Sequence, residues 1–373
     1  MPVQHALRVV DVAVADEVQA GVDRLTHAPD ATGHGLTRVS PVTELRAPDF
    51  ADVLAARLRI APYLAPTPAY RYAGLDRLCG ATVWVKHENH QPVGAFKIRG
   101  GINLVSQLSD DERRRGVVTA STGNHGQSIA YAARLFGVSA TVCAPLAANP
   151  VKVQAIRDLG ADVVLEGEDF EAARGAAERI AVERGSRYIH SGDEPLLIAG
   201  VATYTLELFE AHPEIDVVIV PIGGGSGAAG ACIVQQTVKP DASVIGVQSA
   251  QAPAAYRSWK ERTTVTAPIA SLAEGLQTGA PFALPQRILR EMLADFITVS
   301  DDDLLHATAA MILHTRNLVE PAGAAALAGA IALRERLEGR TVGIVCSGGN
   351  IGPAQLAQVV DMVQREHAVP AAV

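Results

Sequence analysis

The chain has little cysteine, few aromatic residues and no long apolar run. Its four cysteines lie far apart and form no CxxC pair, so we interpret them as small core residues in a reducing compartment. No run approaches the ~18 apolar residues of a membrane span. The N-terminus also lacks the basic and apolar segments of a signal peptide. These absences predict a soluble cytoplasmic protein with no membrane partner.

Long basic clusters are also missing. The formal net charge is -8 at pH 7, and the run Arg113–Arg115 directly follows three acidic residues. Such a pattern is typical of a solvated helix end rather than a nucleic-acid contact. We therefore expect no nucleic-acid partner.

The residues that are present favour a globular α/β enzyme. The chain has 373 residues, of which 48% are hydrophobic and 19% charged, with 33 glycines. Short apolar runs predict strands, and helical patterns separate them, so the strands should pair in parallel with right-handed crossovers. The expected strands are 81–85, 116–120, 140–144, 162–165, 188–190, 216–222, 243–247 and 341–345. The expected helices include 97–109, 151–159, 170–184, 198–211 and 302–315, while 75–78 is predicted as a turn.

Three glycine-containing turns follow predicted strands, at 121–127, 223–230 and 347–352. In open α/β sheets, ligands bind at the carboxyl ends of the strands. Lys97 lies after another turn and beside Phe96. Partial burial would lower its pKa towards that of a nucleophile. We expect Lys97 and the three turns to converge on one cleft.

The second turn raises an alternative. Gly225–Gly230 matches G-x-G-x-x-G, a pattern of nicotinamide dinucleotide sites. Such sites usually have an acidic residue about 20 positions further on, where this chain has Gln248. No GK[ST] follows, so a nucleoside triphosphate is not indicated either. A ligand with one phosphate and no ribose suits the loop better, and an NAD-dependent oxidoreductase remains a distant alternative.

Five motifs in order resemble the serine/threonine dehydratase family of pyridoxal-phosphate enzymes, which has the tryptophan-synthase-β-like fold. They are Val93–Gly100, Ser121–Gln127, Gly223–Gly227, Glu320–Gly323 and Ser347–Asn350. The resemblance covers about residues 50–365 and implies an open parallel-sheet α/β architecture with two lobes and the cofactor between them. It implies a small domain at 116–192, inserted into a large domain formed by 48–115 and 193–373. Residues 1–47 would be an N-terminal extension.

The resemblance implies pyridoxal 5'-phosphate as the cofactor and gives each matched residue a role. Lys97 would form the Schiff base, Phe96 would pack on the pyridine ring, and Asn124 would bond its 3-hydroxyl. Ser347 would face the pyridine nitrogen, and Glu320 would lie near the ring or cap the following helix. The phosphate would bind to Gly223, Gly224, Gly225, Ser226 and Gly227. The substrate would bind to Ser121, Thr122, Gly123, Asn124 and His125.

The activity implied is elimination of water from an L-β-hydroxy amino acid such as threonine or serine, giving a 2-oxo acid and ammonia, by a homodimer. Lys97, Ser121 and Thr122 are the candidate catalytic residues. The Thr122 hydroxyl keeps an amino acid racemase open as an alternative, alongside a β-replacement enzyme. We expect His125 to fix its loop rather than act as a base.

The sequence also departs from the family pattern. The usual Thr-Gly-Ser-Phe-Lys is Val93-Gly-Ala-Phe-Lys here, which predicts an apolar wall beside Lys97 and poor use of 3-hydroxyaspartate. The only cation that the motif supplies is Arg99, which the helix should turn away. Relatives place an acidic metal ligand where this chain has Gln248, and His87 with His90 does not complete a ligand set. No metal is therefore expected.

Overall fold

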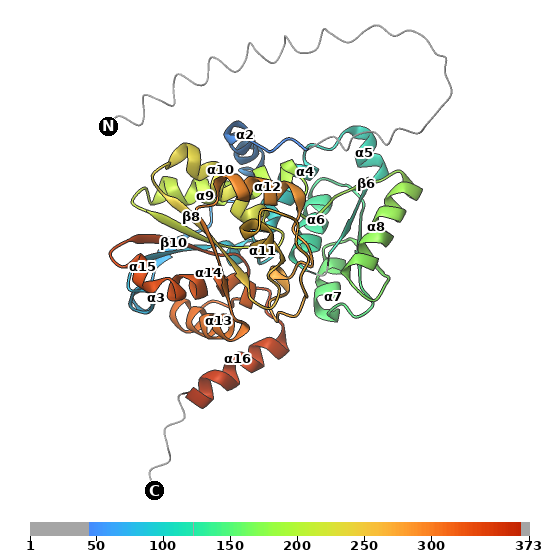
Figure 1. The fold of residues 1–373 in the computed structure, drawn as a ribbon. Helices are drawn as coiled ribbons and strands as arrows, with labels where there is room; N and C mark the ends of the chain where they lie inside the picture. Colours follow the sequence, from blue (N-terminus) through green and yellow to red (C-terminus); the bar gives the residue numbers. More distant parts are fainter. Residues whose placement is uncertain (1–44, 122, 367–373) are drawn as a thin grey trace, which may run out of the picture. The chain divides into compact units, whose positions relative to one another are not determined.

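The computed structural model describes residues 45–366 except Thr122. Most of the predicted N-terminal extension, residues 1–44, lies outside the described residues. The described part contains two open sheets with helices packed around them (Figure 1).

The larger sheet has six strands in the order β1-β2-β10-β7-β8-β9. They are β1 (Ala69–Arg71), β2 (Thr82–His87), β7 (Val217–Pro221), β8 (Ser243–Ser249), β9 (Asp295–Val299) and β10 (Thr341–Cys346). All neighbours pair in parallel except β1, which is antiparallel to β2 at one edge. The central strands are almost continuously apolar, because helices cover both faces of a parallel sheet.

The smaller sheet has the order β5-β4-β3-β6, and all its pairs are parallel. Its strands are β3 (Val117–Ala120), β4 (Ala140–Ala144), β5 (Asp162–Leu165) and β6 (Arg187–Tyr188). The predicted parallel α/β architecture is therefore confirmed. A separate sheet within 117–188 supports the proposed insertion at 116–192, whose limits stay a prediction.

Four helices begin at clear side-chain caps: Asp49, Ser109, Asp169 and Ser300 each accept a backbone N–H from the first turn. Around the first half of the chain lie α2 (Phe50–Ile60), α3 (Ala73–Cys79), α4 (Lys97–Val105), α5 (Asp110–Arg115), α6 (Asn124–Leu135), α7 (Pro150–Asp158), α8 (Phe170–Arg184) and α9 (Pro195–Ala211). The second half has α10 (Ser226–Val238), α11 (Ala254–Lys260), α12 (Ala283–Met292), α13 (Asp301–Thr315), α14 (Pro321–Ala332), α15 (Arg334–Leu337) and α16 (Pro353–Glu366). Short 3-10 turns lie at η2 (Glu88–His90) and η3 (Glu274–Leu276).

Two local predictions were wrong. The expected turn at 75–78 lies within helix α3, where the missing side chain of Gly74 leaves room for His314 of α13. The helix that starts at Lys97 ends at Val105 rather than at Ser109, because Ser109 is the N-cap of α5.

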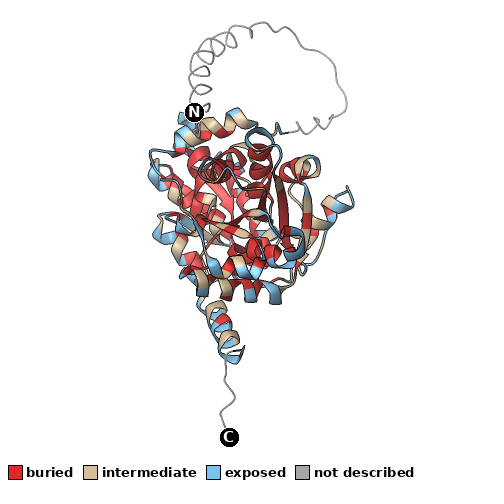
Figure 2. Ribbon diagram, turned by 90° about the vertical axis from the view of Figure 1, so that its left-hand side faces the viewer, coloured by how far each residue is buried: buried red, intermediate tan, exposed pale blue. Residues whose placement is uncertain are grey.

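Three helices pack against the smaller sheet in one part of the core. A single cluster of buried side chains joins Ile98 of α4, Ile129 of α6, Val142 of β4 and Leu197 of α9. Figure 2 shows buried residues throughout this interior, and the described residues from Leu45 onward belong to one compact unit. Ile198 of α9 belongs to a second buried cluster with Val218 of β7, so α9 packs against both sheets.

The position of Lys97 is fixed by an unusually close contact between α4 and α9. A Cβ atom at Gly200 would lie 2.7 Å from the Cα atom of Gly100, and one at Gly100 would lie 2.9 Å from the carbonyl oxygen of Leu197. The backbones touch where larger residues would push the helices apart. Lys97 is the first residue of α4, so this packing fixes where its side chain begins.

A buried ion-pair network holds the same helix. Arg99 Nε donates to Glu88 Oε2 at 2.7 Å, and Arg99 Nη1 donates to Glu207 Oε1 at 2.6 Å. Lys86 Nζ completes the network at 2.5 Å from Glu207 Oε2. Burial opposes the charge of Glu88, but the guanidinium of Arg99 keeps the pKa of this carboxyl below its usual value. Arg99 is thus directed into the interior, as expected.

Within the described residues, no helix is both long and apolar enough to cross a membrane.

Candidate active site

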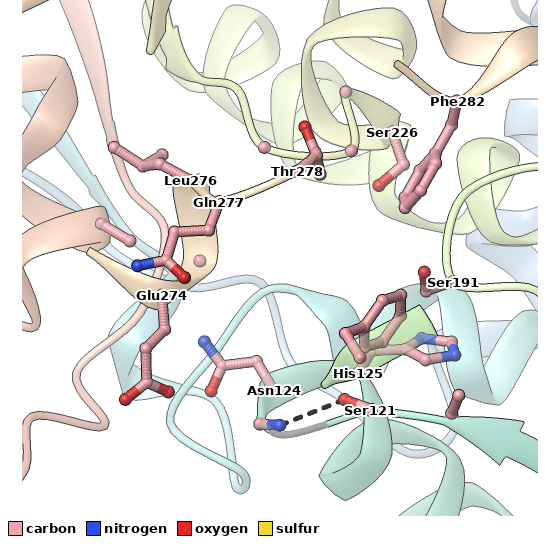
Figure 3. A pocket seen from close by; sticks show the side chains of 18 of the residues that line it. Ser121, Asn124, His125, Ser191, Ser226, Glu274, Leu276, Gln277, Thr278 and Phe282 are labelled. Carbon is pink, nitrogen blue, oxygen red and sulfur yellow. Dashed lines mark hydrogen bonds between the residues drawn. The ribbon is translucent and has the colours of Figure 1, made fainter. Parts of the chain in front are cut away.

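A cavity of about 940 Å³ opens between the two sheets. Residues of all three predicted turns line it together with Lys97: the turn after β3, the turn after β7, and Ser347 after β10. The predicted convergence is therefore confirmed. Figure 3 shows the side chains of Ser226 and Glu274 on opposite sides of this cavity. Its volume suits a cofactor together with a small substrate.

Among the residues that the structure describes, the Lys97 amine has no acidic partner. Its Nζ atom donates to Ser226 Oγ at 2.9 Å and to the carbonyl oxygen of Ser191 at 3.4 Å. It lies 5.3 Å from the centre of the Phe96 ring. Burial lowers the pKa of Lys97 to about 8, because the ammonium form loses hydration. Such an amine is a far better nucleophile at neutral pH than an ordinary lysine.

The loop after β7 is shaped for an anion. A Cβ atom at Gly223 would lie 2.2 Å from the carbonyl oxygen of Gly275, and one at Gly224 would lie 2.3 Å from the Phe282 ring. Gly225 has a φ of 86°, which glycine adopts without strain. Helix α10 starts at Ser226, so its free N–H groups and positive dipole end lie at the cavity. The loop fits a phosphate group.

The remaining glycines of the G-x-G-x-x-G pattern contribute to packing. Gly227 lies against Tyr204 and Phe96, and a Cβ atom at Gly230 would lie 2.9 Å from Ala202 of α9. At the end of β8, Gln248 is buried, accepts from the N–H of Tyr256 at 2.9 Å and donates to the carbonyl oxygen of Leu276 at 3.4 Å. Because Gln248 carries an amide, this position has no carboxylate that could bind a ribose or a cation.

The turn after β3 lines the opposite wall. Ser121 is buried, and its Oγ accepts from the Gly123 N–H at 3.1 Å (Figure 3). Asn124 begins α6 with its amide held at both ends: Nδ2 donates to Glu320 Oε1 at 2.6 Å, and Oδ1 accepts from Asn350 Nδ2 at 2.7 Å. Thr122, the residue on which the racemase alternative depends, lies outside the described residues.

Glu320 occupies the N-cap position of α14 without capping it. Its side chain instead holds Asn124, and burial raises the pKa of its carboxyl. Ser347 lies across the cavity at the end of β10, where its hydroxyl donates to the carbonyl oxygen of Ala322 at 3.3 Å. The backbone oxygen of Ser347 accepts from the Phe96 N–H at 3.1 Å, which ties the start of α4 to β10.

His125 is oriented by Thr119. The Thr119 hydroxyl donates its one proton to the carbonyl oxygen of Ile189 at 2.7 Å, so it accepts from His125 Nε2 at 2.9 Å. Burial lowers the pKa of His125 well below its usual value, and the ring stays neutral. These contacts agree with a loop-fixing role.

Two neighbouring histidines outside the cavity are also accounted for. His87 Nε2 lies 2.9 Å from the Tyr72 hydroxyl, and His90 Nε2 lies 2.7 Å from Asn317 Oδ1. Burial lowers the pKa of His87 to about 4. In the described residues, no group of three or more His, Cys, Asp or Glu side chains is arranged to hold a metal ion.

The prediction of an apolar wall beside Lys97 was wrong. Val93 and Ala95 are buried in the protein rather than lining the cavity, because the turn before α4 points them into the core. Much of the wall comes from the segment 266–283, which sequence reasoning left without a role. Within it, Glu274 Oε2 accepts from Lys152 Nζ of α7 at 2.5 Å. A sequence signal that could have pointed to this segment is Gly275, which lies in the short 3-10 helix η3.

Comparisons with known proteins agree with this geometry. Residues 60–348 match the family model described as "Pyridoxal-phosphate dependent enzyme". The chain is 35% identical over 288 residues to an L-threonine ammonia-lyase from Thermotoga maritima, covering 77% of this chain and 72% of that protein. It is 34% identical over 314 residues to an L-threo-3-hydroxyaspartate ammonia-lyase from Saccharomyces cerevisiae, covering 84% and 96%. A serine racemase structure from Dictyostelium discoideum superposes with a TM-score of 0.77 at 31% identity, covering 82% and 99%.

Proposed function

Because the chain belongs to the family of pyridoxal-phosphate dependent enzymes, we propose that it is an ammonia-lyase acting on an L-β-hydroxy amino acid such as threonine or serine. The products would be a 2-oxo acid and ammonia. The observation that carries the proposal is the Lys97 amine, which has no acidic partner among the described residues and shares one cavity with an anion-binding glycine loop.

The cavity residues fit the cofactor. Lys97 would hold it covalently, Gly223–Gly227 would bind its phosphate, and Phe96 would pack on its ring. Asn124 has one N–H and one lone pair left for its hydroxyl, since Glu320 and Asn350 use the others. When bound, the cofactor supplies an electron sink for the substrate's α-carbon.

The chain's own residues would handle the protons and the substrate. With a pKa of about 8, Lys97 is far more often a free amine at neutral pH than an ordinary lysine, so it suits removal of the α-proton. Ser121 and the N–H groups of 121–125 would bind the substrate carboxylate. The neutral Ser347 hydroxyl would not keep the pyridine nitrogen protonated as a carboxylate would, and this would favour loss of the β-hydroxyl over return of the α-proton.

Charges around the cavity argue against a second carboxylate on the substrate. The described lining contains five acidic side chains and three basic ones: Asp169, Glu171, Asp193, Glu274 and Glu320 against Lys97, Lys152 and Arg174. Lys152 is paired with Glu274, and Arg174 is paired with Glu171 at 2.5 Å. Apart from Lys97, which would hold the cofactor, every described lysine and arginine of the lining is paired, so a second carboxylate would be buried at a cost in desolvation.

We therefore expect L-threonine and L-serine to exceed 3-hydroxyaspartate by at least about tenfold in kcat/KM, a difference of roughly 1.4 kcal/mol. Release of 2-oxo acid from L-serine, L-threonine, 3-phenylserine and 3-hydroxyaspartate, measured in parallel, tests this ranking. Glu274→Gln is the matched variant, since it frees Lys152 and should raise the relative rate with 3-hydroxyaspartate several-fold. A wild-type preference for 3-hydroxyaspartate would refute the charge argument.

A racemase is the second candidate, favoured by the similarity to the Dictyostelium serine racemase structure. A racemase would need a group such as the Thr122 hydroxyl to return a proton to the α-carbon of the substrate. Chiral chromatography of L-serine after incubation with the enzyme distinguishes the two. D-serine formed faster than pyruvate would favour the racemase.

We also propose a homodimer located in the cytoplasm. The four cysteines are buried and unpaired, which supports a reducing compartment. Sedimentation velocity of the purified chain tests the dimer, and a single monomeric species at micromolar concentration would exclude it.

A further inference from the structure

Ser226 is the one residue of the phosphate-binding loop Gly223–Gly227 that carries a side chain. It is 2% exposed and forms the first residue of α10. Gly225, not Ser226, is the N-cap of that helix, and no side chain caps it. The Ser226 hydroxyl is therefore buried at the cavity without a role in the secondary structure.

Among the described residues, this hydroxyl has one hydrogen-bond partner, the amine of Lys97 at 2.9 Å. The second contact of the amine, to the carbonyl oxygen of Ser191, is longer at 3.4 Å. Lys97 Nζ is the donor, so Ser226 Oγ is the acceptor and keeps its own proton. That proton remains available to an anion held by the surrounding N–H groups.

We propose that Ser226 is a positioning residue that holds the free amine of Lys97 whenever the lysine is not bound to the cofactor. The inference rests on the proposed function. It assigns to Ser226 a contact with the lysine in addition to the phosphate contact shared by the whole loop. The Ser226 hydroxyl keeps the released Lys97 amine beside the anion-binding loop. From this position the amine can return to the cofactor.

The proposal has a measurable electrostatic consequence. A hydrogen bond to an ammonium is stronger than one to a neutral amine, so Ser226 stabilises the protonated form of Lys97. Burial is the only cause that shifts the Lys97 pKa downward, to about 8. His125 and His190, two histidines that interact electrostatically with Lys97, both have a pKa lowered from the usual histidine value by burial. They do not titrate in the range where Lys97 does.

The experiment measures the pKa of Lys97 in the cofactor-free protein, from the pH dependence of its acetylation by acetic anhydride with mass-spectrometric readout of the Lys97 peptide. Ser226→Ala and Ser226→Gly should lower this pKa by about one pH unit, because both lose the acceptor. Ser226→Thr keeps the hydroxyl and should keep the wild-type value. Circular dichroism establishes that each variant is folded.

An unchanged pKa in the folded alanine and glycine variants would overturn the inference. An equal fall in all three variants, threonine included, would also overturn it, because the hydroxyl would not be the cause. Borohydride reduction of the wild-type holoenzyme separates this result from failure of the proposed function. A label on Lys97 with no effect at Ser226 rejects the inference alone, whereas a label on another lysine rejects both.

Discussion

Lys97→Ala is expected to lower the kcat for 2-oxo acid release from L-threonine by at least about 10³-fold. The variant loses both the covalent attachment of the cofactor and the base for the α-proton, and a positioned base alone contributes about 10²–10⁴-fold. The measurement is steady-state production of 2-oxobutyrate in the presence of excess cofactor. The effect should be on kcat more than on KM, because the substrate carboxylate would bind to the separate loop at Ser121.

The fold should tolerate this change. Lys97 takes part in no ion pair among the described residues, so its removal leaves no buried carboxylate unpaired. Lys152→Ala serves as the control, since it removes a second lysine of the same cavity whose partner, Glu274, is 40% exposed. A Lys97→Ala variant with activity within about tenfold of wild type would contradict the assigned role.

Ser347→Asp is expected to change which reaction the enzyme performs. A carboxylate at the end of β10 would pair with a protonated pyridine nitrogen and stabilise negative charge at the α-carbon. The charge would then persist long enough for the α-proton to be returned. We expect 2-oxo acid formation to fall about tenfold or more and exchange of the α-proton with solvent to rise. Proton NMR of L-threonine in D₂O follows both processes in one sample.

The matched control is Ser347→Asn, because the asparagine side chain has nearly the same size as aspartate but carries no charge. It should lose some activity through the lost bond to Ala322 without increasing exchange. If the ratio of α-proton exchange to 2-oxo acid formation were the same in the two variants, the charge at position 347 would not act on the ring nitrogen.

Much of the fold could be predicted because its local signals are strong. The strand 140–144 and the helix 170–184 have the predicted limits. The first is an apolar run of a parallel sheet, and the second starts where Asp169 accepts from the Ala172 N–H and ends at Gly185 in a left-handed conformation. Helix α3 also ends at a left-handed glycine, Gly80, but no side chain caps its start at Tyr72. It is seven residues long, contains Gly74, and is held by packing against α13.

The site was predictable where its residues lie in contiguous motifs. Lys97 and the three turns each follow a strand, and the sheet topology brings those strand ends together. The partners of these residues were not predictable. Asn124 and Asn350 are 226 positions apart, and Lys152 and Glu274 are 122 apart. A single sequence carries no signal that joins such pairs.

The prediction of an apolar wall beside Lys97 failed for a related reason, because it depended on contacts that a single sequence does not show. Val93 and Ala95 are near Lys97 along the chain, but nearness along the chain does not determine which side chains face the cavity. Backbone contacts fix the turn: Ala95 bridges to Gly348, and the Val93 carbonyl oxygen accepts from Asn350 Nδ2 at 2.9 Å. These contacts direct both side chains inward.

The central claim is that Lys97 is the residue that carries the cofactor. Reduction of the purified holoenzyme with sodium borohydride, followed by proteolysis and mass spectrometry, tests it most directly. The account predicts that the pyridoxyl label is found on the peptide containing Lys97. A label on a different lysine, or no label after incubation with excess pyridoxal phosphate, would contradict it.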